Sequence, residues 1–243
     1  MITFLINAIK IIFLLGFLVI IHEGGHFVIA KLCKVRVNEF AIGFGKKIYS
    51  KKIGETVYEL RLIPLGGFVS MEGEEHHSDN EGSFNLASYP KKIAIVMTGG
   101  LTNIIFGLIL YYFLIAYISD FQSAYSSTLK FIELTFENLK NIFTGHIVKE
   151  QLIGPVGISA MIAKTSDILN YLYLLAVISL SLGVTNLLPF PPLDGGKVLI
   201  YLIEWITKKD IKENIQLKIQ SVGFTLIILL SIYVMYSDII KLF

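Results

Sequence analysis

The chain has 243 residues, of which 54% are hydrophobic and only 16% are charged, and its mean hydropathy is +0.67. A soluble globular protein of this composition would lack polar cover for its surface, and a disordered chain would be more polar. The net charge of +2 is too small for binding nucleic acid by phosphate neutralisation. A single cysteine excludes an internal disulfide and a multi-cysteine zinc site. The composition therefore predicts an integral membrane protein.

Four segments are apolar enough to cross a bilayer, which takes about 20 mostly apolar residues. They cover residues 2–30, 93–118, 168–203 and 219–236. The third segment contains Pro189, Pro191 and Pro192, which remove backbone donors and break a helix. Broken backbone at membrane depth is tolerated only inside protein or beside water. We therefore expect an α-helical polytopic membrane protein with about four transmembrane helices, the third one broken.

Basic residues near the span ends predict the orientation, because cytoplasmic loops carry an excess of lysine and arginine. They gather after the first and third spans and before the second. These residues are Lys31, Lys34, Arg36, Lys46, Lys47, Lys91, Lys92, Lys208, Lys209, Lys212 and Lys218. We expect both termini to lie outside the cytoplasm, with the late parts of spans one and three in the cytosolic half of the membrane.

The loops between spans carry two further patterns. Within residues 35–70, the alternation at Tyr58, Leu60 and Leu62, flanked by glycine-rich stretches, predicts a small antiparallel β-hairpin or sheet against the bilayer surface. Residues 71–88 lack periodicity and are expected to form a solvated loop. Apolar residues at helical spacing over 126–143 predict a helix. This helix either lies in the outer membrane interface or packs on the other spans.

His22-Glu23-Gly24-Gly25-His26 fits the pattern H-E-x-x-H near the end of the first span. On a helix, residues four apart share a face, so both imidazoles can bind one Zn²⁺. Glu23 would act beside them as a general acid and base, taking a proton from water and returning it to the leaving amine. Ionisable groups inside an apolar span are costly, and they usually mark a functional site. A polar cluster without a metal is the alternative.

Two histidines leave a zinc site one protein ligand short. His76 and His77 fall in the expected solvated loop and His146 falls on the outer side, so all three are poor candidates. Asp194 follows the proline-rich break of span three, at the same expected depth as the two histidines of span one. We therefore expect Asp194 to be the third ligand. Lys197, one turn further on, is expected to extend toward the cytosolic surface.

Two asparagines near these elements stay ambiguous at this level. Asn186 precedes the proline-rich break, and Asn103 follows two glycines in the second span. Each amide could hydrogen-bond backbone near its own helix or contact a substrate, and the glycines beside Asn103 could simply pack against another helix.

Four motifs together resemble those of the site-2 protease family: HEGGH in the first span, IGFG followed by IPLGGFV, TGGLTN in the second span, and NLLPFPPLDGG in the third. Members of this family are zinc metalloproteases that cut transmembrane segments within the bilayer. The bacterial branch that cleaves anti-sigma factors and signal-peptide remnants is the most similar. The motifs keep their order along nearly the whole chain, so we expect residues 1–243 to form a single protease domain.

The resemblance implies a role for each matching residue. His22, His26 and Asp194 correspond to the zinc ligands, and Glu23 corresponds to the catalytic acid and base. Asn186 corresponds to an asparagine that helps to hold substrate near the metal. The family's membrane-dipping β-hairpin can pair through its exposed edge with an unwound substrate. The hairpin positions implied in substrate binding are Gly43, Gly45, Gly66 and Gly67.

Members with these motifs usually carry one or two PDZ domains between spans two and three. Residues 120–170 are too few for such a domain, so we expect that insert to be absent. The resemblance implies regulated intramembrane proteolysis in the cell membrane, with the lipid bilayer and substrate transmembrane helices as partners. A metal-ion transporter or sensor using the same histidine, glutamate and aspartate side chains is the alternative, and an inactive scaffold that sequesters helices is a third possibility.

Overall fold

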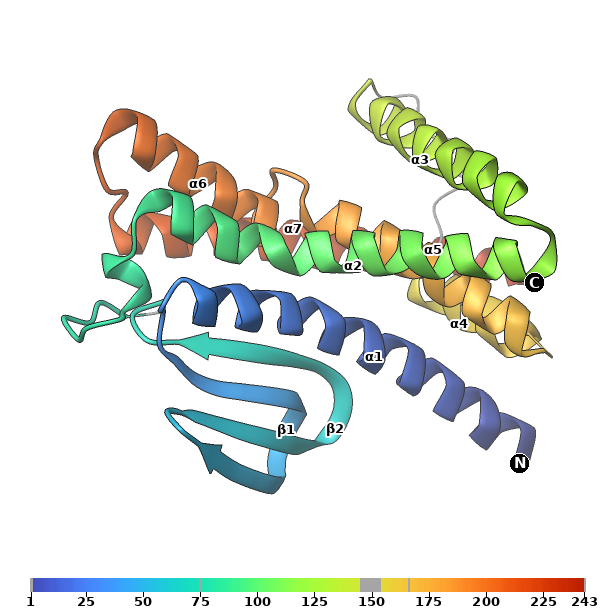
Figure 1. Ribbon diagram of the computed structural model, residues 1–243, viewed down its shortest axis with the longest axis horizontal. Coiled ribbons are helices and arrows are strands. Elements are labelled where there is room, and N and C mark those ends of the chain that lie inside the picture. Colours follow the sequence, from blue (N-terminus) through green and yellow to red (C-terminus); the bar gives the residue numbers. More distant parts are fainter. Residues whose placement is uncertain (1, 75, 145–153, 166, 243) are drawn as a thin grey trace. The chain divides into compact units, whose positions relative to one another are not determined.

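The computed structural model describes residues 2–74, 76–144, 154–165 and 167–242. The chain divides into two compact units, Met1–Ile104 with Ser181–Phe224, and Ile105–Leu180 with Thr225–Phe243. Figure 1 labels the helices and strands along the chain. In order they are α1 (Ile2–Leu32), β1 (Val37–Ile53), β2 (Thr56–Met71), the 3₁₀ turn η1 (Phe84–Leu86), α2 (Tyr89–Ile118), α3 (Phe121–Phe143), α4 (Pro155–Lys164), α5 (Ile168–Asn186), α6 (Asp194–Thr207) and α7 (Glu213–Leu242).

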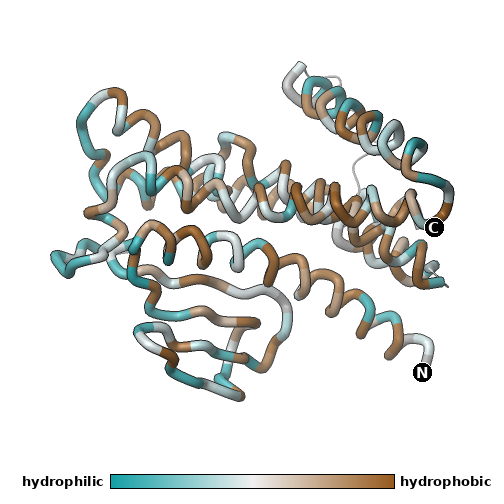
Figure 2. The backbone as a smooth tube through the Cα atoms, in the orientation of Figure 1, coloured by the Kyte–Doolittle hydropathy of each residue, from teal (hydrophilic) through white to brown (hydrophobic). Residues whose placement is uncertain are grey.

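Among the described residues, four helices are long and apolar enough to cross a membrane. Figure 2 shows the apolar character of the long helices α1 and α2. The four candidate spans are Leu5–Leu32, Tyr89–Ile118, Ile168–Asn186 and Glu213–Ile240. This result confirms the expected α-helical polytopic membrane protein with about four spans and a small antiparallel sheet.

The third predicted span, 168–203, consists of two helices. The helix α5 ends at Asn186, and α6 begins at Asp194 after the stretch that contains the three prolines. The break packs tightly against α6, because a Cβ on Gly195 would lie 2.3 Å from the carbonyl oxygen of Leu187. At 14 residues, α6 is too short to cross a bilayer alone. Asp194 therefore starts a new helix directly after the break.

The sheet is formed by β1 and β2, which pair antiparallel. Both strands bend, so that one strand pairs with more than one part of the other. Residues 39–42 of β1 lie between residues 57–60 and residues 67–70 of β2. Gly43 and Gly66 have φ angles of +88° and +109°, a region that glycine adopts at little cost. Within the described residues, segment 67–71 pairs with β1 on one side only, so it is an edge of the sheet.

The edge segment and the loop after it are anchored to α1 and α2. A Cβ on Gly67 would lie 3.6 Å from the Val19 side chain of α1, and Phe84 joins a buried apolar cluster. That cluster consists of Ala30, Val35, Val37, Met71, Phe84, Ile95 and Val96. The expectation of a merely solvated loop over 71–88 is therefore wrong for Phe84, which is only 2% exposed.

The same loop is also fixed by one carboxylate. Glu72 accepts hydrogen bonds from the side chains of Ser78, Asn38 and Asn80. These hydrogen bonds favour the charged form and lower the pKa of Glu72 to about 2. The start of the loop is thus tied to β1 and to the chain that follows.

The second unit contains α3, α4 and most of α5, with the adjoining halves of α2 and α7. The helix predicted over 126–143 is α3, and its Phe131 ring stacks on Tyr111 of α2 with centroids 4.5 Å apart. This contact favours a helix packed on a span. Asp238 of α7 accepts hydrogen bonds from the backbone N–H groups of Gly154 and Gly157, at 3.0 and 2.8 Å. It thereby caps α4, a helix that the sequence patterns do not predict.

Candidate metal centre

Three side chains from distant parts of the chain converge in the first unit. His22 and His26 lie one turn apart on α1, and Asp194 begins α6. Asp194 Oδ2 lies 3.1 Å from Nε2 of His22 and 3.4 Å from Nε2 of His26. The two Nε2 atoms are 3.2 Å apart. The three atoms form a nearly equilateral triangle.

This triangle fits a zinc ion. Ligand atoms about 2.0–2.1 Å from Zn²⁺ in tetrahedral geometry lie about 3.3–3.4 Å from each other. Asp194 Oδ2 is buried and, among the described residues, makes no hydrogen bond of normal geometry. A buried carboxylate oxygen without such a bond is costly in a protein interior, and a shared cation would stabilise it. Two imidazoles and one carboxylate are a common catalytic zinc ligand set.

The other nitrogen of each imidazole is also engaged, which fixes the orientation of the rings. Nδ1 of His26 lies 2.8 Å from the carbonyl oxygen of Ile95 in α2, so it donates to that oxygen. Nδ1 of His22 faces two side-chain amides, those of Asn103 and Asn186, each at 3.5 Å. Such outer contacts set which ring nitrogen is available to a metal. For His26 that nitrogen is Nε2, because its Nδ1 carries the proton, and Nε2 of His22 faces the same triangle.

Two glycines allow α2 to approach α1 at the centre. A Cβ on Gly25 would lie 2.7 Å from the carbonyl oxygen of Thr98, and one on Gly99 would lie 2.2 Å from His26 Nε2. The Thr102 hydroxyl adds a hydrogen bond to the Ile21 carbonyl at 3.2 Å. In contrast, a Cβ on Gly24 would have no neighbour within 4 Å. Of the two glycines inside H-E-x-x-H, Gly25 therefore serves helix packing and Gly24 faces open space.

We expect Gly99→Ala to weaken zinc binding by about 10- to 100-fold, the usual effect of disturbing groups around metal ligands. The added methyl group would displace the imidazole of His26. Gly24→Ala is the matched control, since the same change there meets no atom and should strengthen the helix by up to about 1 kcal/mol. Competition with a zinc chelator measures both variants. Equal zinc affinity in the two would contradict this account of the α1–α2 contact.

The three side chains line a cavity of about 640 Å³ together with Glu23. The edge strand forms another wall through residues 68–71. Glu23, the predicted acid and base, and Val69 of that strand line the same cavity. Polar residues of the loop and of α7 also line the cavity, namely Glu74, His76, Glu213, Gln216 and Gln220.

The hairpin glycines implied in substrate binding are not equally placed. Gly67 lies beside the centre, because a Cβ there would be 3.7 Å from Glu23 Cγ. Gly43, Gly45 and Gly66 have positive φ angles and form the bends of the hairpin. The cavity wall is formed instead by the residues that follow Gly67.

The other residues singled out in the sequence lie outside the ligand triangle or outside the described residues. His76 lines the cavity but lies outside the ligand triangle, with its Nδ1 3.6 Å from Glu213, and His146 falls outside the described residues. Lys197 does not simply extend to the surface as expected, because its ammonium donates to Glu74 at 2.9 Å. The sequence does not predict that Glu74 lies beside Lys197, because the loop that carries Glu74 shows no periodic pattern.

Three further residues contribute to the centre, and the sequence indicates them only in part. The sequence leaves the role of Asn103 ambiguous, although its position in the TGGLTN motif is a usable signal. Gly99, in the same motif, permits the close approach of α2. The carbonyl of Ile95 carries no side-chain signal, and only the packing of α2 against α1 reveals it.

The chain is similar to proteins that carry metalloprotease names. The family described as Peptidase family M50 matches residues 10–230. A Clostridium perfringens protein named "Putative zinc metalloprotease CPE1693" is 29% identical over 92% of this chain and 95% of its own length. A Clostridium acetobutylicum protein named "Putative zinc metalloprotease CA_C1796" is 27% identical over 96% and 97%. "Regulator of sigma-E protease RseP" of Escherichia coli is 39% identical over 46% of this chain and 26% of its own length.

The clostridial alignments run over 319 and 330 positions. Both figures exceed the 243 residues of this chain. Those relatives therefore carry residues that have no counterpart here.

Proposed function

Because the chain belongs to peptidase family M50, the site-2 proteases, and is a membrane metalloprotease, we propose that it hydrolyses peptide bonds within the transmembrane segments of other membrane proteins. The observation that carries the proposal is the triangle of His22, His26 and Asp194 beside Glu23, in one cavity at the end of a membrane-spanning helix.

The proposed cofactor is Zn²⁺, held by His22, His26 and Asp194. When bound, zinc supplies a Lewis acid that polarises a carbonyl group and lowers the pKa of a water molecule. Glu23 would take the proton of the attacking water, hold it on its carboxylate and deliver it to the leaving amine. The place of Glu23 in the cavity lining beside the ligand triangle supports this role. Asn186, beside His22, is proposed to help hold the substrate near the metal.

The edge strand at residues 67–71 is the proposed substrate platform. It lines the cavity through Phe68–Met71, and its outer side is not paired with another described strand. An extended peptide could pair with this edge through main-chain hydrogen bonds. A peptide bond inside a helix has its carbonyl already hydrogen-bonded within the helix. The substrate segment must therefore unwind before it can bind and react.

The setting proposed for this reaction is a cell membrane, with both termini outside the cytoplasm and the centre in the cytosolic half. Lysine and arginine near the span ends support this orientation. The resemblance of the four motifs implies an anti-sigma factor or a signal-peptide remnant as the proposed substrate. The name of the Escherichia coli relative, "Regulator of sigma-E protease RseP", fits a regulatory protease.

Cleavage of a defined transmembrane peptide by the purified, reconstituted chain tests the proposal. We expect cuts inside the apolar segment that stop on zinc chelation and resume when zinc is restored. Mass spectrometry of the products locates the cut. Zinc binding without any cleavage of several such peptides would favour a metal transporter or sensor instead.

Replacing Gly, Pro or Asn near the cut by leucine should slow cleavage of that peptide. Gly and Pro in a helix interior cost about 1 and 3 kcal/mol relative to alanine, so their removal makes the segment harder to unwind. Initial rates for the paired peptides measure the effect. The control carries the same replacements one helical turn outside the cut region. Equal rates for the original and the leucine peptide would show that unwinding does not limit the reaction.

A further inference from the structure

A second hollow, of about 570 Å³, lies where α1 ends and α2 begins. It shares no lining residue with the cavity at the metal centre. Four cationic side chains line it: Lys31, Lys34, Arg36 and Lys91. Two acidic residues, Glu55 and Glu81, are also part of the lining, which leaves an excess of positive charge.

These four cations are not neutralised by close carboxylates. In the part of the chain that the structure describes, the lysine and arginine ion pairs within 4.0 Å are made by Lys47, Arg61 and Lys197. Lys91 donates to a carbonyl oxygen, that of Cys33, at 3.3 Å. Glu72 interacts electrostatically with Arg36, but this carboxylate already accepts three hydrogen bonds from other side chains. Like charges gathered round one hollow repel each other, and an anion in it would stabilise them.

The hollow also has an apolar side. Leu86 is part of its lining and is 57% exposed, and Leu32, which stands in the chain between the lining residues Lys31 and Cys33, is 72% exposed. Val35 and Ser83 are almost fully buried in the lining. The site therefore combines cations and exposed leucines, and its floor is formed by the buried residues Val35 and Ser83. A ligand that fits must carry negative charge next to hydrocarbon.

The position along the chain indicates which ligand has that chemistry. The candidate spans end at Leu32 and begin at Tyr89, so the hollow lies at a membrane interface, where lipid headgroups are found. Basic clusters next to transmembrane helices bind anionic lipid headgroups. We propose that this hollow binds an anionic phospholipid, with its phosphodiester on the four cations and its acyl chain along Leu32 and Leu86.

The only cysteine of the chain provides a local reporter. Cys33 is partly exposed and lines this hollow. The full chain in detergent micelles is treated with N-ethylmaleimide, and intact-mass spectrometry follows alkylation. Phosphatidylglycerol, phosphatidylcholine or inorganic phosphate is added in turn. We expect phosphatidylglycerol to slow alkylation in a saturable way, and the other two to leave the rate unchanged.

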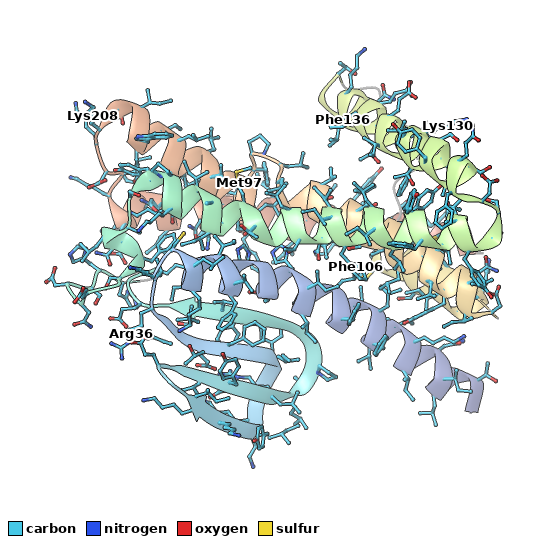
Figure 3. The ribbon with its side chains drawn as sticks, in the orientation of Figure 1. Arg36, Met97, Phe106, Lys130, Phe136 and Lys208 are labelled. Atoms are coloured by element: carbon cyan, nitrogen blue, oxygen red, sulfur yellow. The ribbon has the colours of Figure 1, made fainter. Side chains whose placement is uncertain are left out.

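The double variant Lys34→Gln/Arg36→Gln should raise the phosphatidylglycerol concentration for half protection about fivefold for each lost cation. Each variant is compared with its own rate without lipid, because the change also alters the surroundings of Cys33. The matched control is Lys208→Gln/Lys209→Gln. It removes the same charge and likewise includes one residue of positive φ, since Lys34 and Lys208 have φ angles of 62° and 52°. Figure 3 shows Arg36 and Lys208 in separate regions.

Protection that is lost in the first variant and kept in the control supports the site. Equal loss in both would mean that general surface charge attracts the lipid, and it would overturn the proposal. Equal protection by phosphatidylcholine would also overturn it, since the anionic charge would then be irrelevant. Competition by inorganic phosphate at the same concentration would assign the hollow to free phosphate and overturn the lipid assignment. Circular dichroism of the variants checks that the helices remain folded.

Discussion

Glu23→Gln should abolish peptide cleavage while the protein still binds zinc. The amide has nearly the same size as the carboxylate but cannot accept and return a proton, and general acid–base catalysis contributes about 10²- to 10⁴-fold to a rate. The triangle of His22, His26 and Asp194 does not include Glu23, so the metal ligands stay in place. Cleavage of a reconstituted transmembrane peptide and zinc content by elemental analysis measure the two effects.

Glu213→Gln is the matched control for this experiment. Glu213 lines the same cavity from α7, and its carboxylate lies near His76, outside the ligand triangle. The same chemical change there should leave both cleavage and zinc content close to those of the unmodified chain. Full activity in Glu23→Gln would move the acid and base to another residue. Loss of zinc together with activity would mean that Glu23 supports the centre structurally.

The spans and the sheet could be predicted because they depend on local patterns. Mostly apolar stretches of sufficient length identify the spans, and three prolines identify the break between α5 and α6. The helix α4 could not be predicted in this way. Its first turn is capped by Asp238, which lies 84 residues from Gly154 in the chain. A cap supplied from so far away leaves no signal near the helix itself.

The same distinction applies to the centre. His22 and His26 are recognisable because one helical turn separates them, and Asp194 because its expected depth matches theirs. The outer contacts depend on how α2 packs against α1, which spacing within either helix does not determine. Asn103 reaches His22 from 81 residues away. Lys197 pairs with Glu74, which lies 123 residues away in the chain. The sequence alone does not reveal this partner.

Asp194→Ala should remove zinc and cleavage together. It deletes one corner of the triangle, and two histidines alone are a poor zinc site. We expect the zinc content to fall from about one ion per chain to near zero. A ligand that binds only the folded state stabilises it. Zinc chelation should therefore lower the melting temperature of the unmodified chain but not that of Asp194→Ala.

Asp167→Ala is the matched control for Asp194→Ala. It also removes an aspartate at the start of a helix, but this aspartate is not a proposed metal ligand. Asp167 accepts hydrogen bonds from the backbone N–H groups of Leu169 and Asn170 at the start of α5, so its removal should cost about 1 kcal/mol. Its zinc content should not change, because it lies in the unit that does not contain the centre. If Asp194→Ala kept its zinc and still responded to chelation, the metal would have to be held without this carboxylate. The pairing of α1 with α6 would then be a structural contact, and the hydrolytic assignment would lose its third ligand.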